Sequence, residues 1–103
     1  MRRYTLSRLA QEDLVAIRDY YLENGGARAA RKVVTELVAA FRRLARNPGV
    51  GHPRADLAGD RPVLFWPVRN YLVVYRATGN RVEVVTVVHG YRDLAPYLDR
   101  LLH

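Results

Sequence analysis

The segment YLVVYRATGNRVEVVTVVHGYRDL, residues Tyr71–Leu94, determines most of the fold expected for this chain. Its two β-rich halves are separated by Gly79-Asn80, a dipeptide that favours a two-residue hairpin turn. A turn at this point places Arg76 opposite Glu83 on the neighbouring strand. Opposite charges at facing positions stabilise an antiparallel pair, so the charges support the same register as the turn.

The same register, continued away from the turn, sets the expected neighbours at the far end of the hairpin. It places Leu72 opposite Val87 and Asn70 opposite His89. Valines 84, 85, 87 and 88 supply apolar side chains on both faces of the second strand. A strand that is apolar on both faces is usually covered on both, so we expect this strand in the interior of the sheet.

The first 46 residues predict a short edge strand followed by two helices. Residues 2–7 alternate weakly between polar and apolar, and Ser7 stands where a helix N-cap is expected. Apolar residues then recur at helical spacing as far as Asn24-Gly25-Gly26, where paired glycines predict a helix end and a tight turn. A second amphipathic stripe follows in residues 27–46, which indicates an antiparallel helical hairpin.

The remaining segments complete one α+β domain covering residues 1–103. The Gly- and Pro-rich residues 48–53 predict a loop, residues 62–67 predict another strand, and a short C-terminal helix is expected to open at Asp93 or Pro96. The expected order is β-α-α-β-β-β-α, with the helical hairpin packed on an antiparallel sheet.

The composition narrows the class of protein. The chain has no cysteine, so neither a disulfide nor a thiolate metal site is expected. Its histidines show no metal-ligand spacing, and no motif indicates a cofactor. No apolar stretch has the length of a membrane span or of a signal peptide, so we expect a cytoplasmic protein.

The charge indicates an anionic partner. Lysine and arginine number 17 against 10 acidic residues, which gives a formal net charge of +7, and Lys32 is the only lysine. Arginine binds phosphates and carboxylates through two parallel hydrogen bonds, so RNA, DNA or an acidic protein segment would suit this chain. The alternative is that the charge serves solubility alone.

The end of the hairpin carries the strongest candidates for catalysis. Cleavage of RNA without a metal needs an acid, a base and cations that meet the charge on the phosphorus centre. His89 and Tyr91 could exchange protons, while Arg69 and Arg92 could hold the phosphate. The alternative is a structural corner between a strand and a helix, in which Gly90 makes a turn and an aspartate caps the helix.

The sequence also resembles a known family. The fragments that carry the resemblance are Ala10-x-x-Asp13-Leu14, Pro48-x-x-Gly51-x-x-Arg54, Tyr71 with Tyr75-Arg76, and His89-Gly90-x-Arg92-Asp93. In order and spacing they are similar to toxins of the ParE/RelE superfamily of bacterial type II toxin–antitoxin modules. The resemblance extends from Leu6 to about Leu98.

The resemblance implies an antitoxin partner with an acidic toxin-binding segment. A helix of that antitoxin is expected in the groove of the helical hairpin. The side chains expected to contact it are Leu14, Ile17, Tyr21, Val34, Leu37 and Phe41. The alternative for this apolar stripe is ordinary core. Arg54 and Arg76 are further candidates for contact with the target or with phosphate.

The resemblance also implies one of two targets. RelE-like members cleave mRNA on the ribosome without a metal, whereas ParE-like members poison DNA gyrase. The helical hairpin and the HGxRD ending favour the ParE branch, and the lysine-rich patch of the nucleases is missing. Gly90, between His89 and Tyr91, also departs from the adjacent His-Tyr pair of some nucleases. A gyrase inhibitor is therefore expected, with the endoribonuclease or a member without toxicity as alternatives.

Overall fold

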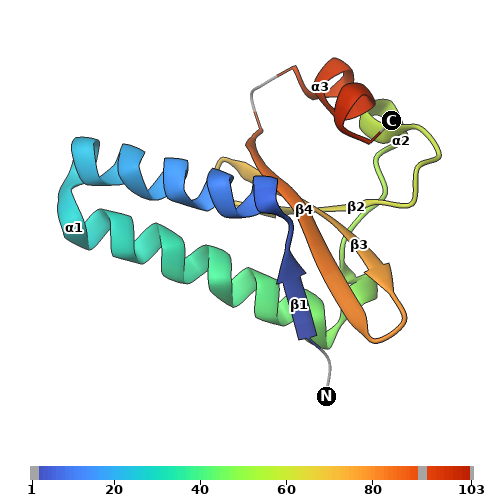
Figure 1. Ribbon diagram of the computed structural model, residues 1–103, viewed down its shortest axis with the longest axis horizontal. Coiled ribbons are helices and arrows are strands. Elements are labelled where there is room, and N and C mark those ends of the chain that lie inside the picture. The colour runs from blue at the N-terminus through green and yellow to red at the C-terminus, as the bar shows by residue number, and fades with distance from the viewer. Residues whose placement is uncertain (1–2, 91–92, 103) are drawn as a thin grey trace.

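The computed structural model describes residues 3–90 and 93–102 and contains the predicted elements in the predicted order (Figure 1). The elements are β1 (Arg3–Leu6), α1 (Arg8–Arg46), a 3-10 turn (Pro48–Val50), α2 (Ala55–Ala58), β2 (Leu64–Val68), β3 (Tyr71–Thr78), β4 (Arg81–His89) and α3 (Leu94–Leu101). The 3-10 turn and α2 were not predicted, because both are short and lie in a segment rich in glycine and proline. The predicted α+β class is confirmed.

The helix α1 is a helical hairpin, as predicted, and not one straight helix. Gly26 has φ 86° and ψ 178°, a conformation outside the helical region that glycine adopts without steric cost. It joins two antiparallel arms, residues 8–25 and 27–46, which project together from the sheet (Figure 1). Ser7 is the N-cap, and its Oγ accepts a hydrogen bond of 3.0 Å from the Ala10 amide.

The sheet has the strand order β1-β4-β3-β2, so β4 lies in the interior as predicted. Strands β2, β3 and β4 are antiparallel, but β1 runs parallel to β4 and the sheet is therefore mixed. The expectation of a wholly antiparallel sheet is wrong for this one strand. No tight turn joins β1 to its neighbour, so local turn geometry imposes no direction on it.

The register of the β3–β4 hairpin changes halfway along its length. Near the turn the prediction is confirmed, since Arg76 faces Glu83 and forms an ion pair of 3.1 Å. A bulge then shifts the pairing by one residue, and beyond it Leu72 faces Val88 and Tyr71 faces His89. The predicted pairs of Leu72 with Val87 and of Asn70 with His89 are wrong for this reason. The extra residue is Val85, and a strand with valines at 82, 84, 85, 87 and 88 offers apolar side chains in either register, so the sequence gives no signal of the bulge.

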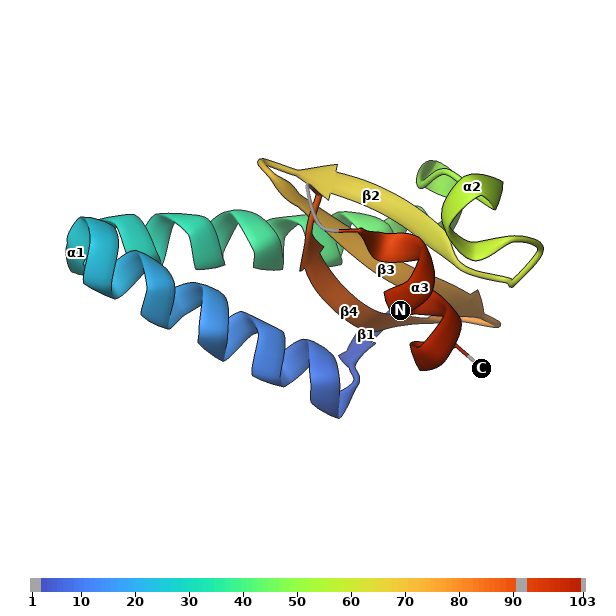
Figure 2. The same cartoon turned by 90° about the horizontal axis from the view of Figure 1, so that it is seen from above.

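Hydrophobic cores form on both faces of the sheet. One lies under the helical hairpin and includes Phe41, Tyr75 and Val87. The other lies under α2 and α3 and includes Phe65 and Leu98. Figure 2 shows α2 and α3 together at the end of the molecule opposite the tip of the helical hairpin. Asp93 occupies the N-cap position of α3, as one alternative predicted, but its side chain makes no capping hydrogen bond.

The side chains of the N-cap Ser7 and of Asp13 in α1 complete the edge of β4 where β1 ends. The strand β1 pairs with residues 81–84 of β4 only. Next along β4, Ser7 Oγ donates to the Val85 carbonyl at 2.6 Å. The carboxylate of Asp13 then accepts from the Thr86 hydroxyl at 2.6 Å and from the Val87 amide at 2.9 Å. The Thr86 hydroxyl and the Val87 amide, which lie beyond the end of β1, thus both find a hydrogen-bond acceptor in one carboxylate of the first arm.

The hydroxyl of Tyr75 fastens the loop after α1 to the sheet. Tyr75 is fully buried, donates to the Pro48 carbonyl at 2.7 Å and accepts from the Gly51 amide at 2.9 Å. Its burial raises the pKa of the phenol above the usual value. A Cβ atom on Gly51 would lie 2.4 Å from the Tyr75 hydroxyl, so only glycine fits at this approach.

Replacing Asp13 with alanine is expected to destabilise the fold by about 2–3 kcal/mol, because a buried hydroxyl and an amide lose their charged acceptor. Urea unfolding of Asp13→Ala and of the matched control Asp19→Ala measures this difference. The Asp19 carboxylate lies in an exposed pair with Arg18, so its loss should cost about 0.5 kcal/mol or less. If the two variants lost the same unfolding free energy, the hydrogen bonds of Asp13 would stabilise the fold no more than an exposed ion pair does.

Replacing Gly51 with alanine should cost about 1–3 kcal/mol, because the new methyl group overlaps the buried Tyr75 ring. The control is Gly49→Ala, because nothing lies within 4 Å of a Cβ built on that glycine. Its unfolding free energy should stay within about 0.5 kcal/mol of the parent value. A Gly51 variant as stable as the Gly49 variant would contradict the close approach.

Candidate functional site

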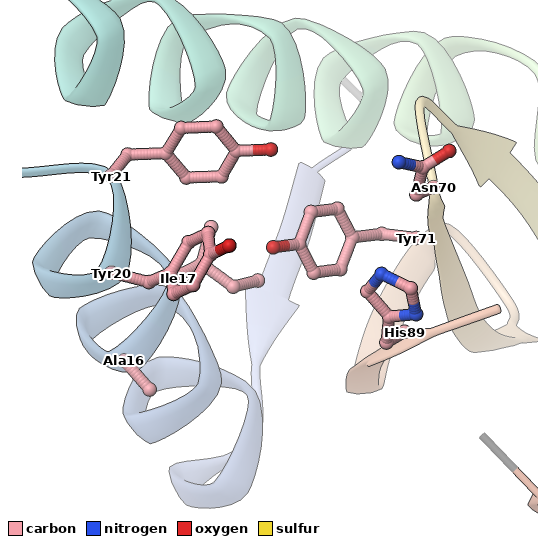
Figure 3. Close-up of a pocket in the computed structure, with 7 residues that line it drawn as sticks. All are labelled: Ala16, Ile17, Tyr20, Tyr21, Asn70, Tyr71 and His89. Atoms are coloured by element: carbon pink, nitrogen blue, oxygen red, sulfur yellow. The ribbon is translucent and has the colours of Figure 1, made fainter. Parts of the chain in front are cut away.

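A polar aromatic pocket opens between the first arm of α1 and the far end of the β3–β4 hairpin (Figure 3). Its volume is about 400 Å³, and its lining residues are Ala16, Ile17, Tyr20, Tyr21, Asn70, Tyr71 and His89. Figure 3 shows the rings of Tyr21 and Tyr71 extending from opposite sides into the space between α1 and the sheet. The pocket thus presents phenol, amide and imidazole groups on an apolar floor, a lining that suits an organic ligand or a protein side chain.

The bulge in β4 brings His89 into this pocket. Because the register shifts, Tyr71 pairs with His89, and their rings meet edge to face with centroids 5.5 Å apart. The Gly90 amide then donates to the Asn70 carbonyl at 2.7 Å and closes the end of the sheet. Asn70 and His89 therefore line the same pocket, but they do not face each other across the two strands as predicted.

The Tyr71 hydroxyl stays protonated at neutral pH. Burial and, to a smaller extent, the neighbouring Tyr21 hydroxyl raise the pKa of Tyr71 to about 12, against a lowering effect of Arg69. A phenol with so high a pKa is a neutral donor or acceptor of hydrogen bonds. It is a poor proton donor or base for catalysis near neutral pH.

Arg69 is held by an acidic partner. Its Nε and Nη2 atoms donate to the two carboxylate oxygens of Glu36, each at 2.7 Å, and the guanidinium lies 6.0 Å from the Tyr21 ring centre. This pairing lowers the pKa of Glu36 and raises that of Arg69. The backbone of Arg69 is left-handed, with φ 54°, in the turn between β2 and β3. Arg69 thus joins that turn to the second arm of α1.

Two further predicted cations, Arg54 and Arg76, are also paired. Arg54 donates to both oxygens of Asp56 at 2.9 and 2.7 Å, which lowers the pKa of the carboxyl and raises that of the guanidinium. Arg76 pairs with Glu83, as its position opposite that residue predicts. Arg54 and Arg69 line a second cavity of about 240 Å³, beside the pocket that contains His89. The remaining candidates, Tyr91 and Arg92, lie outside the described residues.

The apolar stripe of the hairpin is mainly core. Ile17, Leu37 and Phe41 are buried against the sheet, the last two completely. The other predicted contact residues, Leu14, Tyr21 and Val34, are partly buried and pack on the same core. Burial of this kind fits the alternative of ordinary core that the sequence left open.

Sequence reasoning missed Val15 and Leu22, two of the apolar side chains that the hairpin exposes. Val15, Tyr20 and Leu22 are 48%, 58% and 43% exposed, and all three lie on the first arm. Val15 and Leu22 are seven residues apart and therefore lie on one face of the helix. The seven-residue spacing is visible in the sequence, but the longer apolar stripe that forms the core dominates the hydrophobic pattern of this helix.

Two further findings concern a metal site and a membrane-spanning helix. Within residues 3–90 and 93–102, no three histidine, cysteine or acidic side chains gather closely enough to hold a metal ion. Among the helices of the same residues, none combines the length and the apolar character needed to cross a membrane.

Comparison with known proteins places the chain in a family. Residues 4–94 match the family model described as the ParE toxin of the type II toxin–antitoxin system parDE. Toxin ParE1 of Caulobacter vibrioides is 37% identical over 99 residues, which cover 95% of this chain and 99% of the relative. Toxin ParE3 of the same organism is 30% identical and covers 97% of this chain and 98% of its own length.

The fold agrees with this assignment. A solved structure described as the chromosomal ParDE toxin–antitoxin system from P. aeruginosa superposes with a TM-score of 0.72 at 22% sequence identity. The superposition covers 86% of this chain and 95% of the other. The family match over most of the chain and the two relatives lead to one conclusion: this chain belongs to the ParE toxin family of type II toxin–antitoxin systems.

Proposed function

We propose that this protein arrests growth by inhibiting DNA gyrase and that a cognate antitoxin neutralises it. The observation that carries the choice of target is the ion pair of Arg69, whose guanidinium is held through two hydrogen bonds by Glu36. An arginine that binds a scissile phosphate must be free to meet it. Here a carboxylate from the second arm of α1 occupies that position.

The surroundings of His89 support the same choice. Metal-free cleavage of RNA requires an acid and a base on opposite sides of a bound phosphate. The His89 ring packs edge to face with the ring of Tyr71, whose raised pKa makes it unsuitable as an acid or base at neutral pH. Arg54, in the neighbouring cavity, is likewise paired with a carboxylate. The ribosome-dependent endoribonuclease is the second candidate, and it rests on the position of His89 in an open pocket.

The first arm of α1 is the surface proposed for the antitoxin. Its exposed apolar side chains lie beside two shallow grooves of about 510 and 250 Å³, of which Val15 lines the first and Leu22 the second. Val34, a predicted contact residue, also lines the second groove. An amphipathic helix could lay its apolar face along this arm. The net charge of +7 would speed the encounter with an acidic partner.

His89→Ala should still inhibit the supercoiling activity of purified gyrase, with less than about a tenfold change in the inhibitory concentration. Asp13→Ala is a control for reduced stability, because its unfolding free energy is lowered while the pocket residues are unchanged, and it should lose inhibition only at temperatures where it has unfolded. Induction of the His89 variant should still block replication first. If the parent protein instead cuts mRNA on the ribosome and the His89 variant does not, the nuclease is the correct function.

Val15→Glu combined with Leu22→Glu should weaken antitoxin binding by at least about tenfold, because two charges replace apolar contacts at the centre of the proposed surface. Calorimetric titration of the antitoxin encoded beside the toxin gene gives the affinity. The control Thr78→Glu with Asn80→Glu adds the same charge at the exposed end of the β3–β4 hairpin and should bind normally. An unchanged affinity in the first variant would place the antitoxin elsewhere.

A further inference from the structure

The positive charge of this protein is unevenly neutralised. Among the described residues, six arginines form ion pairs within 4 Å: Arg8, Arg18, Arg54, Arg61, Arg69 and Arg76. Within the described part of the chain, Arg3, Arg42, Arg46 and Arg81 form no ion pair. These four are exposed, and we refer to them together as the arginine corner.

The fold brings the arginine corner together from three distant segments. Tyr4 of β1 packs on Phe41 of α1, with ring centres 5.5 Å apart, and so fixes the strand against the last turns of the second arm. Figure 1 shows β1 beside that end of α1. Arg3, Arg42 and Arg46, together with Tyr4 and Ala45, line a shallow cavity of about 320 Å³. Arg81 is the β4 residue in register with Arg3.

The arrangement places like charges at positions where they repel. Arg3 faces Arg81 across the β1–β4 pair, and facing like charges destabilise a sheet. Arg42 and Arg46 are four residues apart on one helix, which is unfavourable for like charges by about 0.2–0.5 kcal/mol. The helix dipole favours cations in the last turn and so accounts for Arg46. It does not account for Arg3 and Arg81, which lie on strands. A bound polyanion would turn both repulsive pairs into attractive contacts.

We propose that the arginine corner binds the phosphodiester backbone of double-stranded DNA. Arg42 and Arg46 are about 6 Å apart along the helix axis, by the rise of about 1.5 Å per residue, and Arg3 extends the line of charge onto the neighbouring strand. The charges are open and spread out, as a repeating polyanion requires, and do not close around one small anion. Each guanidinium can hold a phosphate through two hydrogen bonds.

An acidic peptide fits this surface less well. Binding of a peptide depends on a few side chains buried in pockets, and the arginine corner offers only Tyr4 and Ala45 beside its guanidinium groups. The exposed apolar side chains lie instead on the first arm of α1. Duplex DNA also holds its phosphates in a regular row of charge, and the backbones of these arginines lie in a helix and two strands, where they are held in place. The inference does not depend on gyrase as the target, because it concerns the binding of DNA by the toxin in the absence of any other protein.

The test is the binding of a fluorescent duplex of about 20 base pairs to the purified toxin, followed by anisotropy at about 50 and 200 mM salt. The triple variant R3Q/R42Q/R46Q should bind at least about tenfold more weakly at the lower salt concentration. Its plot of log affinity against log salt should also be less steep, by about 2–3, since each lost phosphate contact removes about 0.9.

The matched control is R28Q/R31Q/K32Q, which removes the same charge from exposed positions of the second arm that also form no ion pair within the described chain. It should bind the duplex within about threefold of the parent affinity, a difference of less than 1 kcal/mol. Equal losses in the two triple variants would show diffuse attraction to net charge and would overturn the proposal. The absence of duplex binding by the parent protein would do the same.

Two additional measurements keep the result interpretable. The duplex should raise the melting temperature of the parent protein but not that of R3Q/R42Q/R46Q, whose own melting temperature in the absence of DNA should be unchanged or higher because the repulsion is relieved. A single-stranded RNA and a poly-glutamate peptide serve as competitors. Tighter binding of either one than of the duplex at the arginine corner would overturn the proposal in favour of that partner.

Discussion

The carboxylate of Asp13 is the contact on which the rest of the structure depends. It accepts from the Thr86 hydroxyl and from the Val87 amide, just where β1 has ended and β4 has no strand neighbour on that side. One side chain of the first arm therefore substitutes for a missing strand and fixes the helical hairpin relative to the sheet. Since an unpaired amide and hydroxyl are costly in a buried place, this arrangement specifies where the hairpin sits as well as stabilising it.

The position of the hairpin then determines the surfaces that are available for function. The first arm packs beside the end of β3 and β4, so Tyr20 and Tyr21 face Tyr71 and His89 across the polar aromatic pocket. The second arm supplies Glu36, which holds Arg69, and ends beside β1, which completes the arginine corner. Anchoring one hairpin thus creates an apolar exposed arm, a polar pocket and a basic surface in separate places.

Local patterns predicted much of this fold, because each rests on neighbours in the sequence. The hairpin turn at Gly79-Asn80, the N-cap at Ser7 and the break at Gly26 depend on turn chemistry and backbone freedom within a few residues. The candidate site was less predictable. His89 and Arg69 were candidates for catalysis only under the alternative of a nuclease. His89 lines an open pocket, whereas Arg69 pairs with Glu36, 33 positions away in the chain. No local pattern indicates such a contact.

The amino-acid sequence was sufficient for the class of fold, the order of elements and the family resemblance, because periodicity, turn residues and motif spacing are properties of short segments. The tertiary structure was needed for the bulge in β4, the parallel direction of β1, the pairing of Arg69 and the convergence of Arg3, Arg42 and Arg46. Each of these results from contacts between segments far apart in the chain. Such contacts form only when the helical hairpin is anchored on the sheet, and no residue's immediate neighbours specify them.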